Sequence, residues 1–453
     1  MATEMKAQLV VIGGGAAGMS AASRARRLQP DWEIAVFERS PNVSFILCGL
    51  PYFVDDVVPS ERDLIVYTPD YFRSERRIDV RTRHEVRRID PSAKAVHAVD
   101  LTSGEPVIAP YEKLVDAGGA LPVRPPIAGI DLEGVFVLRS IESGVAIKEF
   151  VGGRSVRRAV VIGGGYVGLE MAEALRGIGA EVTLLEALAH VLPGGEPEIA
   201  ALVEEELQRQ GVVGRTQEMA RRFEGDGAVR KVVTDGGDIE ADLVLVSVGV
   251  RADAAVAKEA GVALGETGAI ATDEMMRTNV PDIYAAGDCA EALHLITGKP
   301  AYVPLGTTAN KQGRVAGENA AGGHATFAGI VGTAAVKVFD LEVARTGLTE
   351  AQAREEGFDA VSSLIRFPSH ARYYPDPRTL TLKLVADRRT GRVLGAQMAG
   401  PGTVAKRIDT VAAALHASMT VDDLMRLDLT YAPPFATAWE GIQIAAQQLA
   451  ARD

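Results

Sequence analysis

The chain of 453 residues contains very little cysteine, with Cys48 and Cys289 as its two thiols. Two cysteines cannot form the disulfide framework of a small secreted domain, and so few are typical of a reducing compartment. No stretch approaches the ~18 consecutive apolar residues of a membrane-spanning helix. The start, "MATEMKAQLVVIGGG", lacks the basic and apolar regions of a signal peptide. We therefore expect a cytoplasmic protein without a membrane span.

The chain also lacks an excess of positive charge. It has 48 Lys and Arg against 60 Asp and Glu, which gives a formal net charge of -12 at pH 7. No run of basic residues offsets this balance, so we do not expect nucleic acid as a partner. The length predicts two or three globular domains.

The clearest positive feature is an internal repeat. "VVIGGGAAG" begins at Val10 and "VVIGGGYVG" begins at Val160. Each copy reads as an apolar strand, a G-x-G-x-x-G turn, a helix and a second strand that ends in an acid. The glycines and the acid are Gly13, Gly15, Gly18 and Glu38 in the first copy, and Gly163, Gly165, Gly168 and Glu186 in the second.

The G-x-G-x-x-G turn alone is a weak signal, but the strand, helix and acid around it make a dinucleotide-binding signature. The first glycine makes a tight turn, the second lets a phosphate approach the backbone, and the third lets the helix pack on the strand. The pyrophosphate then meets the helix N-terminus. The alternative is a glycine-rich turn without a ligand. The repeat predicts an α/β fold with two Rossmann-like domains, each binding one dinucleotide.

Two later segments complete the predicted organisation. In "TNVPDIYAAGDCAE" a short strand, 283–285, leads to Asp288, whose carboxylate could accept hydrogen bonds from the sugar-alcohol chain of a flavin. A surface turn is the alternative. From Gly332 the chain alternates strands such as "TLTLKLVAD" with helical segments, the last from Thr437. This pattern predicts a separate α+β domain, and "GALPVRPPIAG" marks a crossover between domains.

In this order the motifs resemble the pyridine nucleotide-disulfide oxidoreductase family over the whole chain. The resemblance implies a glutathione-reductase-like fold, FAD in the first glycine turn and NAD(P)H in the second. It implies an FAD-binding domain at 1–118 and 252–331, an NAD-binding domain at 119–251, and a dimerisation domain at 332–453 that forms a homodimer. Further FAD positions implied by it are Ala17, Arg39, Val86, Ala117, Gly118 and Ala309. Further NAD positions are Gly249, Tyr166, which resembles the family tyrosine over the flavin, and Glu170, which resembles the acid that holds the carboxamide. A packed helix residue is the alternative for Tyr166 and Glu170.

The segment "SFILCGLPYF" decides the branch of the family. Glutathione and lipoamide reductases have a second cysteine five positions after the first, whereas here that position is Phe53. The segment instead resembles the single-cysteine branch of NADH peroxidases, NADH oxidases and coenzyme A-disulfide reductases. The peroxidases and many of the oxidases place a histidine in the first glycine turn, where this chain has Ala16.

"HARYYPD" and "TYAPPF" resemble the segments from which coenzyme A-disulfide reductases supply tyrosines to the other subunit. The resemblance implies that Cys48 forms a mixed disulfide with coenzyme A and that Tyr373 and Tyr431 protonate the leaving thiolate. Packed interface tyrosines are the alternative. The implied coenzyme A ligands are Ser20, Arg24, Arg27, Ser44, Arg76, Asn310 and His370. The alternatives are a solvated arginine face on the first helix and a hydrogen-bonded surface histidine.

The residues also favour one nicotinamide cofactor. Glu186 can accept both ribose hydroxyls and would repel a 2'-phosphate, and the following "ALAHVLPGG" has no Arg or Lys to bind one. NADH is therefore expected over NADPH, and no metal site is expected. Cys48 precedes a helix with Pro51 in its first turn, so we expect the helix N-terminus, together with an adjacent oxidised flavin, to favour the thiolate. We expect Cys289 to be a packing residue.

Together these features predict an NADH-dependent flavoprotein that reduces coenzyme A disulfide and accepts polysulfide or persulfide as well. One alternative is an NADH oxidase or peroxidase in which Cys48 cycles through a sulfenic acid. A second is a redox sensor that binds NADH without turnover.

Overall fold

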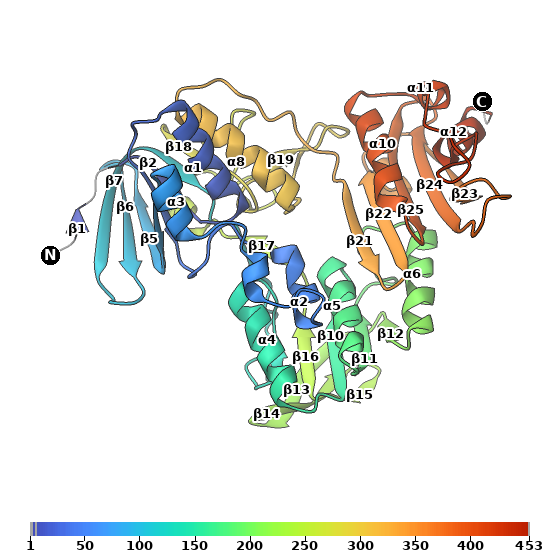
Figure 1. Cartoon of the computed structure of the whole chain (residues 1–453), viewed down its shortest axis with the longest axis horizontal. Helices are drawn as coiled ribbons and strands as arrows, with labels where there is room; N and C mark the ends of the chain where they lie inside the picture. Colours follow the sequence, from blue (N-terminus) through green and yellow to red (C-terminus); the bar gives the residue numbers. More distant parts are fainter. Residues whose placement is uncertain (1–2, 5–6, 452–453) are drawn as a thin grey trace.

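The structure is a computed structural model that describes residues 3–4 and 7–451. Figure 1 shows three lobes, with the N-terminal sheet on the left, a second sheet below it and the C-terminal sheet on the right. We call them the first, second and third lobe. The domain limits expected from the sequence stay a prediction.

The first lobe is built on an eight-stranded sheet with the order β4-β3-β2-β7-β6-β5, in which β1 and β18 also pair with β7. Strands β2, β3, β4, β7 and β18 run parallel, whereas β5 and β6 continue from β7 as antiparallel strands. Strand β18 occupies the three residues expected for it. The strands are β1 (Thr3–Glu4), β2 (Ala7–Ile12), β3 (Ile34–Glu38), β4 (Asp79–Thr82), β5 (His84–Asp90), β6 (Ala95–Asp100), β7 (Pro106–Asp116) and β18 (Ile283–Ala285).

Two helices of the first lobe, α1 (Ala16–Leu28) and α8 (Gly306–Ala320), pack closely against each other. A Cβ atom at Gly313 would overlap the backbone of Ala17, and one at Gly317 would overlap the backbone of Ala21. Glycine in α8 therefore allows this close approach. As a result, a late segment of the chain covers the first glycine turn.

The second lobe has a parallel sheet with the order β12-β11-β10-β16-β9 and a separate antiparallel sheet, β13-β14-β15. Strands β8 (Ala120–Pro122) and β17 (Val250–Ala252) pair where the chain enters and leaves this lobe. The elements are β9 (Val135–Phe136), α4 (Ile141–Gly153), β10 (Arg158–Ile162), α5 (Tyr166–Gly177), β11 (Glu181–Glu186), α6 (Pro197–Arg209), β12 (Val213–Thr216), β13 (Ala220–Asp226), β14 (Ala228–Thr234), β15 (Gly237–Glu240) and β16 (Leu243–Val246).

The third lobe has an antiparallel sheet with the order β21-β22-β25-β24-β23, packed against α10 and α12. The last helix begins at Gly441 and not at Thr437, because the side chain of Glu440 accepts a hydrogen bond from the first turn and caps it there. The elements are β21 (Ala334–Val338), β22 (Leu341–Gly347), α9 (Glu350–Glu355), β23 (Ala360–Pro368), β24 (Thr379–Asp387), β25 (Val393–Gly400), α10 (Val404–His416), α11 (Val421–Arg426) and α12 (Gly441–Ala450).

Buried charges join the second and third lobes. The Lys383 Nζ of β24 lies 2.9 Å from carboxylate oxygens of both Glu196 and Glu198, at the start of α6. The backbone N–H of Glu196 donates to Gln397 of β25 at 2.7 Å.

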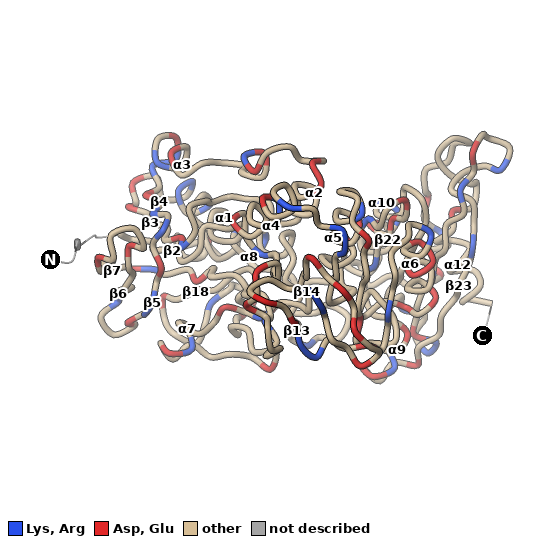
Figure 2. The backbone as a smooth tube through the Cα atoms, turned by 90° about the horizontal axis from the view of Figure 1, so that it is seen from below, with Lys and Arg blue, Asp and Glu red and all other residues tan. Residues whose placement is uncertain are grey.

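Elsewhere Figure 2 shows positive and negative residues interspersed along the chain. Within the described ranges, no helix combines the length and the hydropathy needed to cross a membrane.

Candidate active site

The first glycine turn joins β2 to α1 and has an open side. Gly13 has a φ of +93°, and a Cβ atom there would overlap the carbonyl oxygen of Ala117. A Cβ at Gly18 would overlap the carbonyl oxygen of Gly13, whereas one at Gly15 would meet nothing within 4 Å. The turn is therefore tightly packed at Gly13 and Gly18 and open at Gly15, where a phosphate would approach the helix N-terminus.

The second glycine turn, between β10 and α5, has the same construction. Gly163 has a φ of +102°, and its Cβ would overlap the carbonyl oxygen of Ser247. A Cβ at Gly168 would overlap Gly163, and a Cβ at Gly165 would again meet nothing within 4 Å. The repeat found in the sequence is thus a repeat of geometry, with an open phosphate position in each copy.

The predicted ribose acids close both turns in the same way. Glu38 accepts a hydrogen bond from the backbone N–H of Gly14 and another from that of Ser40, each at 2.7 Å. Glu186 accepts from Gly164 at 2.8 Å and from Leu188 at 2.9 Å. These bonds orient each carboxylate at its turn and leave lone pairs for ribose hydroxyls.

Several predicted flavin residues gather around the first turn. A Cβ atom at Gly287 would lie 2.7 Å from the Cβ of Ala17 and 3.5 Å from that of Ala309. Ala117 and Gly118 follow β7 directly beside Gly13. These residues form a narrow, small-residue cradle beside the open position, which fits an extended dinucleotide.

The other predicted flavin positions have protein partners. The carboxylate of Asp288 lies 2.6 Å from the guanidinium of Arg139, which comes from the second lobe. Sequence reasoning missed Arg139, because nothing in its local sequence indicates a partner 149 residues away. Arg39 pairs with Asp253 at 3.2 Å, and Val86 packs against the core of the first lobe.

Cys48 lies in a short 3-10 turn, Leu47–Gly49, directly before α2 (Leu50–Val54). Its side chain is exposed, and Pro51 occupies the first turn of α2 as expected. Cys289 is buried and its Sγ lies 3.4 Å from the carbonyl oxygens of Asp116 and Ala286. Cys48 therefore has no second thiol of this chain as a disulfide partner.

The expectation that the helix N-terminus and an adjacent oxidised flavin favour the Cys48 thiolate stays a prediction. The pKa of Cys48 is raised above its ordinary value, chiefly because the surrounding protein desolvates the thiolate. A hydrogen bond from the backbone N–H of Cys48 lowers this pKa, and the charge of Glu170 raises it, so the backbone at the helix start favours the thiolate without offsetting its desolvation.

Two further titratable groups accompany Cys48. Burial raises the pKa of Glu170 to about 7, with a contribution from the charge of Glu173. Burial also raises the pKa of Tyr52 to about 12, with contributions from Glu170, Glu173 and Cys48. Helices α2 and α5 pack against each other, which brings these groups together. Sequence reasoning missed Tyr52, although it stands four residues after Cys48.

The first turns of α5 carry both predicted nicotinamide residues. Tyr166 is half-buried, and burial raises its pKa. Glu170 lies one helical turn further on the same helix, so the two side chains share a face. Gly249, with a φ of +104°, lies directly before β17 with open space beside it.

The two predicted catalytic tyrosines lie together in the third lobe. Tyr373 lies between β23 and β24 and Tyr431 lies between α11 and α12, and their hydroxyl oxygens are 3.5 Å apart. Tyr373 is 76% exposed and Tyr431 is 49% exposed. In Figure 1, β23 and β24 lie at the right end of the molecule, whereas α2 lies in the middle. Within one chain the tyrosine pair is therefore remote from Cys48.

His370 is fixed within the same loop. Its Nδ1 lies 2.9 Å from the hydroxyl of Ser369, and its Nε2 lies 3.0 Å from the carbonyl oxygen of Pro375. Both ring nitrogens thus have partners, as expected for the alternative of a hydrogen-bonded surface histidine. Its role as a coenzyme A ligand stays a prediction.

The other predicted coenzyme A residues lie around α1. Ser20 donates to Asn310 of α8 at 2.8 Å, and Arg24 pairs with Glu318 of α8 at 2.7 Å. Arg27 is exposed and makes no ion pair with any described residue. Ser44 is held at the first glycine turn, because its N–H donates to the carbonyl of Gly14 at 2.8 Å.

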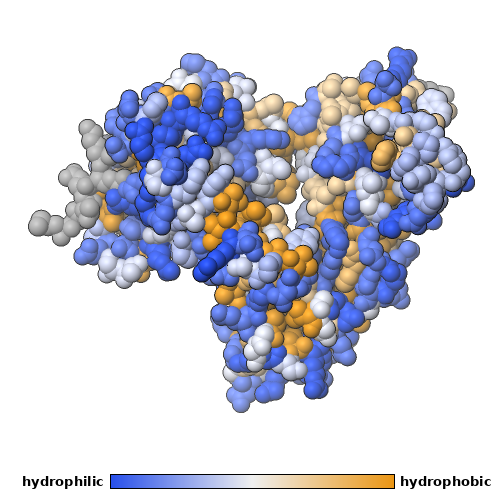
Figure 3. Space-filling model, viewed as in Figure 1, coloured by the Kyte–Doolittle hydropathy of each residue, from blue (hydrophilic) through white to orange (hydrophobic). Residues whose placement is uncertain are grey.

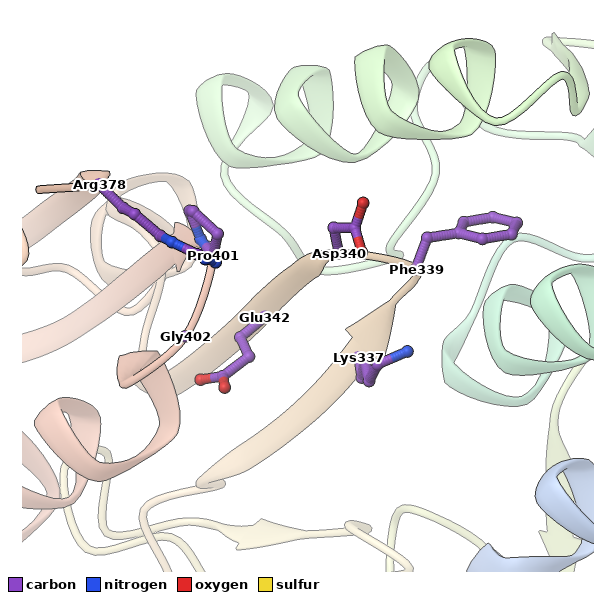
Figure 4. Close-up of a pocket in the computed structure, with 7 residues that line it drawn as sticks. All are labelled: Lys337, Phe339, Asp340, Glu342, Arg378, Pro401 and Gly402. Atoms are coloured by element: carbon purple, nitrogen blue, oxygen red, sulfur yellow. The ribbon is translucent and has the colours of Figure 1, made fainter. Parts of the chain in front are cut away.

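A surface cavity of about 440 Å³ lies away from these groups. Figure 4 shows its lining at the β21–β22 hairpin and the neighbouring loops, comprising Lys337, Phe339, Asp340, Glu342, Arg378, Pro401 and Gly402. None of these is a predicted site residue, and Lys337 is paired with Glu173 of α5.

Among the residues that the structure describes, no group of three or more His, Cys, Asp or Glu side chains is placed to hold a metal ion.

Comparison with known proteins identifies the family. The family described as "Pyridine nucleotide-disulphide oxidoreductase" matches residues 7–313, and its dimerisation domain matches residues 333–441. The chain is 43% identical to an NAD(P)H sulfur oxidoreductase (CoA-dependent) of Pyrococcus abyssi, over 98% of this chain and 99% of the relative. It is 31% identical to a coenzyme A disulfide reductase of Staphylococcus haemolyticus, over 95% and 96% of the two chains.

Among solved structures, an NAD-dependent persulfide reductase from A. fulgidus is similar with a TM-score of 0.95. The two chains are 42% identical, and the alignment covers 98% of this chain and 83% of the other. The expected α/β fold and oxidoreductase class are confirmed. The chain therefore belongs to the pyridine nucleotide-disulphide oxidoreductase family, whose members use FAD and NAD(P)H.

Proposed function

We propose that this oxidoreductase uses NADH to reduce coenzyme A disulfide, and that polysulfide and persulfide are further substrates. One observation carries the proposal. Cys48 is exposed, whereas Cys289 is buried and hydrogen-bonded in the first lobe. The disulfide partner of Cys48 therefore comes from a small molecule. The names of the relatives, which include a CoA-dependent sulfur oxidoreductase and a coenzyme A disulfide reductase, support this choice of thiol.

The residues around the first glycine turn fit FAD. Gly15 is open to a phosphate, Ala17 and Ala309 border the cradle, and Glu38 is oriented for a ribose. FAD, when bound, supplies two-electron transfer between the nicotinamide and a sulfur. Asp288 and Arg139 form an ion pair beside this cradle and would hold the flavin side chain.

The chemistry of Cys48 is thiol–disulfide exchange. Its thiolate attacks one sulfur of coenzyme A disulfide, so that the substrate S–S bond breaks and a Cys48–coenzyme A disulfide bond forms. The first coenzyme A leaves as a thiolate and takes a proton. Two electrons then cleave the mixed disulfide, returning the Cys48 thiolate and the second coenzyme A. In sum, NADH, one proton and one disulfide give NAD⁺ and two thiols.

The raised pKa of Cys48 means that the free thiol holds its proton more firmly than an ordinary cysteine. Its carboxylate neighbour Glu170 adds to this effect while it is charged. Bound cofactors displace water from around Cys48 and alter the local charge. We therefore expect the fraction of Cys48 present as thiolate to change during turnover.

Tyr373 and Tyr431 are proposed as the proton donors to the leaving thiolate. Their hydroxyls lie 3.5 Å apart on an exposed surface of the third lobe. In a homodimer they would reach Cys48 from the second subunit, and the match of residues 333–441 to a dimerisation domain supports this arrangement. Figure 3 shows hydrophobic residues near the hollow between the left and right lobes, a surface that a second subunit could cover.

NADH is proposed to bind the second glycine turn. Glu186 is 6% exposed and both its oxygens are oriented by backbone N–H groups. Its negative charge suits two ribose hydroxyls and opposes a 2'-phosphate. Tyr166 and Glu170 lie on the helix that begins at this turn, where a nicotinamide ring would approach.

The test is replacement of Cys48 by serine in the flavin-loaded enzyme. Cys48→Ser is expected to lower coenzyme A disulfide reduction to background while FAD remains bound and reducible by NADH. Cys289→Ser is the matched control and is expected to retain turnover, because its thiol is buried away from substrate. Mass spectrometry of the unreduced protein should find coenzyme A on Cys48, and disulfide turnover by Cys48→Ser would contradict the proposal.

An NADH oxidase or peroxidase is the second candidate, because an exposed lone thiol can also form a sulfenic acid. Ala16, in place of a histidine, argues against it. A mass increase of one oxygen on Cys48, with oxygen or peroxide turnover above disulfide turnover, would favour this candidate. Binding of NADH without turnover of any oxidant would favour the redox sensor.

A further inference from the structure

Three polar side chains form a row across the sheet of the third lobe and face the second lobe. Arg345 of β22 is opposite Gln397 of β25, and Gln397 is opposite Lys383 of β24. Because directly opposite residues share a face of a sheet, the three side chains lie side by side. Gln397 and Lys383 contact the start of α6. The row therefore presents two positive charges to the second lobe.

The two cations of this row have different surroundings. The Nζ of Lys383 lies within 3.5 Å of Glu196, Glu198 and Glu350. The guanidinium of Arg345 is half-buried, and in the described part of the chain it pairs with no acid and its buried Nε has no hydrogen-bond partner. Partial burial of a charge without a counter-charge costs free energy, and an anionic ligand would offset that cost. The charge of Arg345 is thus available to a ligand.

Arg345 contacts the segment that follows Glu186. Its Nη1 donates to the carbonyl of Gly194 at 3.0 Å, and a Cβ atom at Gly194 would lie 2.7 Å from the same nitrogen. Two residues earlier, the N–H of Leu192 donates at 2.8 Å to the carbonyl of Gly164, which belongs to the second glycine turn. The Cα atoms of Leu192 and Gly194 are at most about 7 Å apart. The guanidinium therefore lies close to the second glycine turn.

The same guanidinium is near Tyr166 at the start of α5. Burial raises the pKa of Tyr166, and the positive charge of Arg345 lowers it in part. Strand β21, which pairs with β22 beside Arg345, contacts α5 (Figure 1). Arg345 is therefore near both the turn proposed for the phosphates of NADH and the tyrosine proposed for its nicotinamide end.

We propose that Arg345 binds a phosphate of the NADH pyrophosphate, so that the third lobe completes the dinucleotide site of the second. The glycine turn itself, "VVIGGGYVG", offers backbone N–H groups but no positive side chain. The hydrogen bond to Gly194 uses one of the five N–H donors of the guanidinium, which leaves others for charge-assisted hydrogen bonds to phosphate. The inference rests on the proposed binding of NADH at this turn, and it adds a binding residue that neither glycine motif contains.

The test uses the flavin-loaded enzyme and needs no disulfide substrate. Arg345→Gln removes the charge, whereas the side chain of Gln397 still donates to the carbonyl of Gly194 at 3.2 Å and keeps the segment in place. The apparent Kd for NADH in anaerobic flavin reduction is expected to rise about 10-fold or more, as for a lost hydrogen bond between charged groups. The Kd of ADP-ribose from titration calorimetry should rise by the same factor.

Two constants should stay the same in Arg345→Gln. The maximal rate of flavin reduction should be nearly unchanged, because the phosphate contact is made before and during hydride transfer alike. The inhibition constant of adenosine, which competes for the same site without any phosphate, should also be unchanged.

Arg392→Gln is the matched control. The Nε of Arg392 is likewise buried without a partner among the described residues, but its Nη2 donates to the carbonyl of Leu295 at 3.4 Å and not to the second lobe. This variant should change none of these constants, and flavin content and Tm verify the fold of each variant.

An unchanged Kd of ADP-ribose in Arg345→Gln, or an equal loss of affinity for adenosine, would overturn the inference while the proposed function stands. A loss confined to NADPH would also overturn it, because it would assign Arg345 to a 2'-phosphate. If NADH does not reduce the flavin of the wild type, the proposed function itself fails.

Discussion

The two glycine turns have the same geometry in different surroundings. In each, the first and third glycines contact backbone, the second is open, and an acid accepts two backbone N–H groups. The first turn is covered by α8 and followed by the segment of Cys48, whereas the second opens onto Tyr166 and Glu170 of α5. We therefore propose that the local pattern specifies a dinucleotide and that the neighbouring elements specify which one.

The largest expected effect comes from adding one methyl group to each turn. Gly15→Ala and Gly165→Ala introduce a Cβ into open space, so the fold should tolerate both, but the methyl would occupy the phosphate position. Gly15→Ala is expected to lower bound flavin by more than about tenfold. Gly165→Ala should keep flavin and raise KM for NADH by a similar factor. Absorbance of the purified proteins and steady-state rates measure both.

The Tm of the cofactor-free proteins is the control for this pair. It should be unchanged within a few degrees, because neither new methyl group contacts protein. Flavin retained by Gly15→Ala, or lost by Gly165→Ala, would reverse the assignment of the two turns.

An intermediate effect is expected from the two acids. Glu186→Ala removes the charge that opposes a 2'-phosphate, together with acceptors for the ribose. The ratio of kcat/KM for NADH to that for NADPH should fall about 10- to 100-fold. Glu38→Ala is the matched variant and should weaken flavin retention without changing this ratio. A wild-type preference for NADPH would refute the role of Glu186.

The smallest expected effect concerns Glu170, which lies on α5 after the second glycine turn. The pKa of Glu170 is raised to about 7, so between pH 4.5 and 7 the folded protein holds a proton that the unfolded chain releases. The contribution of this group to stability is therefore lost as pH rises through that window. Glu170→Gln should remove on the order of 1–3 kcal/mol of this pH dependence. Thermal unfolding of flavin-free protein at pH 5 and pH 8 measures it.

Glu173→Gln is the control for Glu170. It removes the charge that pairs with Lys337 and weakens the contact with the Phe339 N–H, so it should lower Tm at both pH values. It should reduce the pH dependence only in part, because burial and not the charge of Glu173 is the main cause of the raised pKa of Glu170. If Glu170→Gln leaves the difference in Tm between the two pH values unchanged, the charge of Glu170 does not oppose folding at neutral pH.

Local patterns predicted the parts of the site that depend on neighbouring residues. The glycine turns, their acids and strand β18 follow from short-range rules, because a strand, a turn and a helix start each have a sequence signature. The pairs Arg139–Asp288 and Arg24–Glu318 could not be predicted in this way, since their partners are 149 and 294 residues apart. These pairs depend on how the lobes and helices pack.

The pKa of Cys48 shows a second limit of prediction from the sequence. The sequence gives the helix after Cys48 but not its length of five residues or the burial around the thiol. Desolvation then outweighs the backbone N–H that favours the thiolate, so the net direction of the pKa shift could not be predicted from the sequence. The family resemblance predicted a shared role for Tyr373 and Tyr431 but not their contact, because no spacing rule relates residues 58 positions apart.

The lysine of β24 described above also constrains how the enzyme can move. Its side chain is 6% exposed and lies within 3.5 Å of Glu196, Glu198 and Glu350, so separating the second lobe from the third would break its ion pairs with Glu196 and Glu198. These two lobes are thus expected to travel as one rigid block. We therefore propose that the nicotinamide is admitted by rotation of the Tyr166 side chain and not by movement of a lobe.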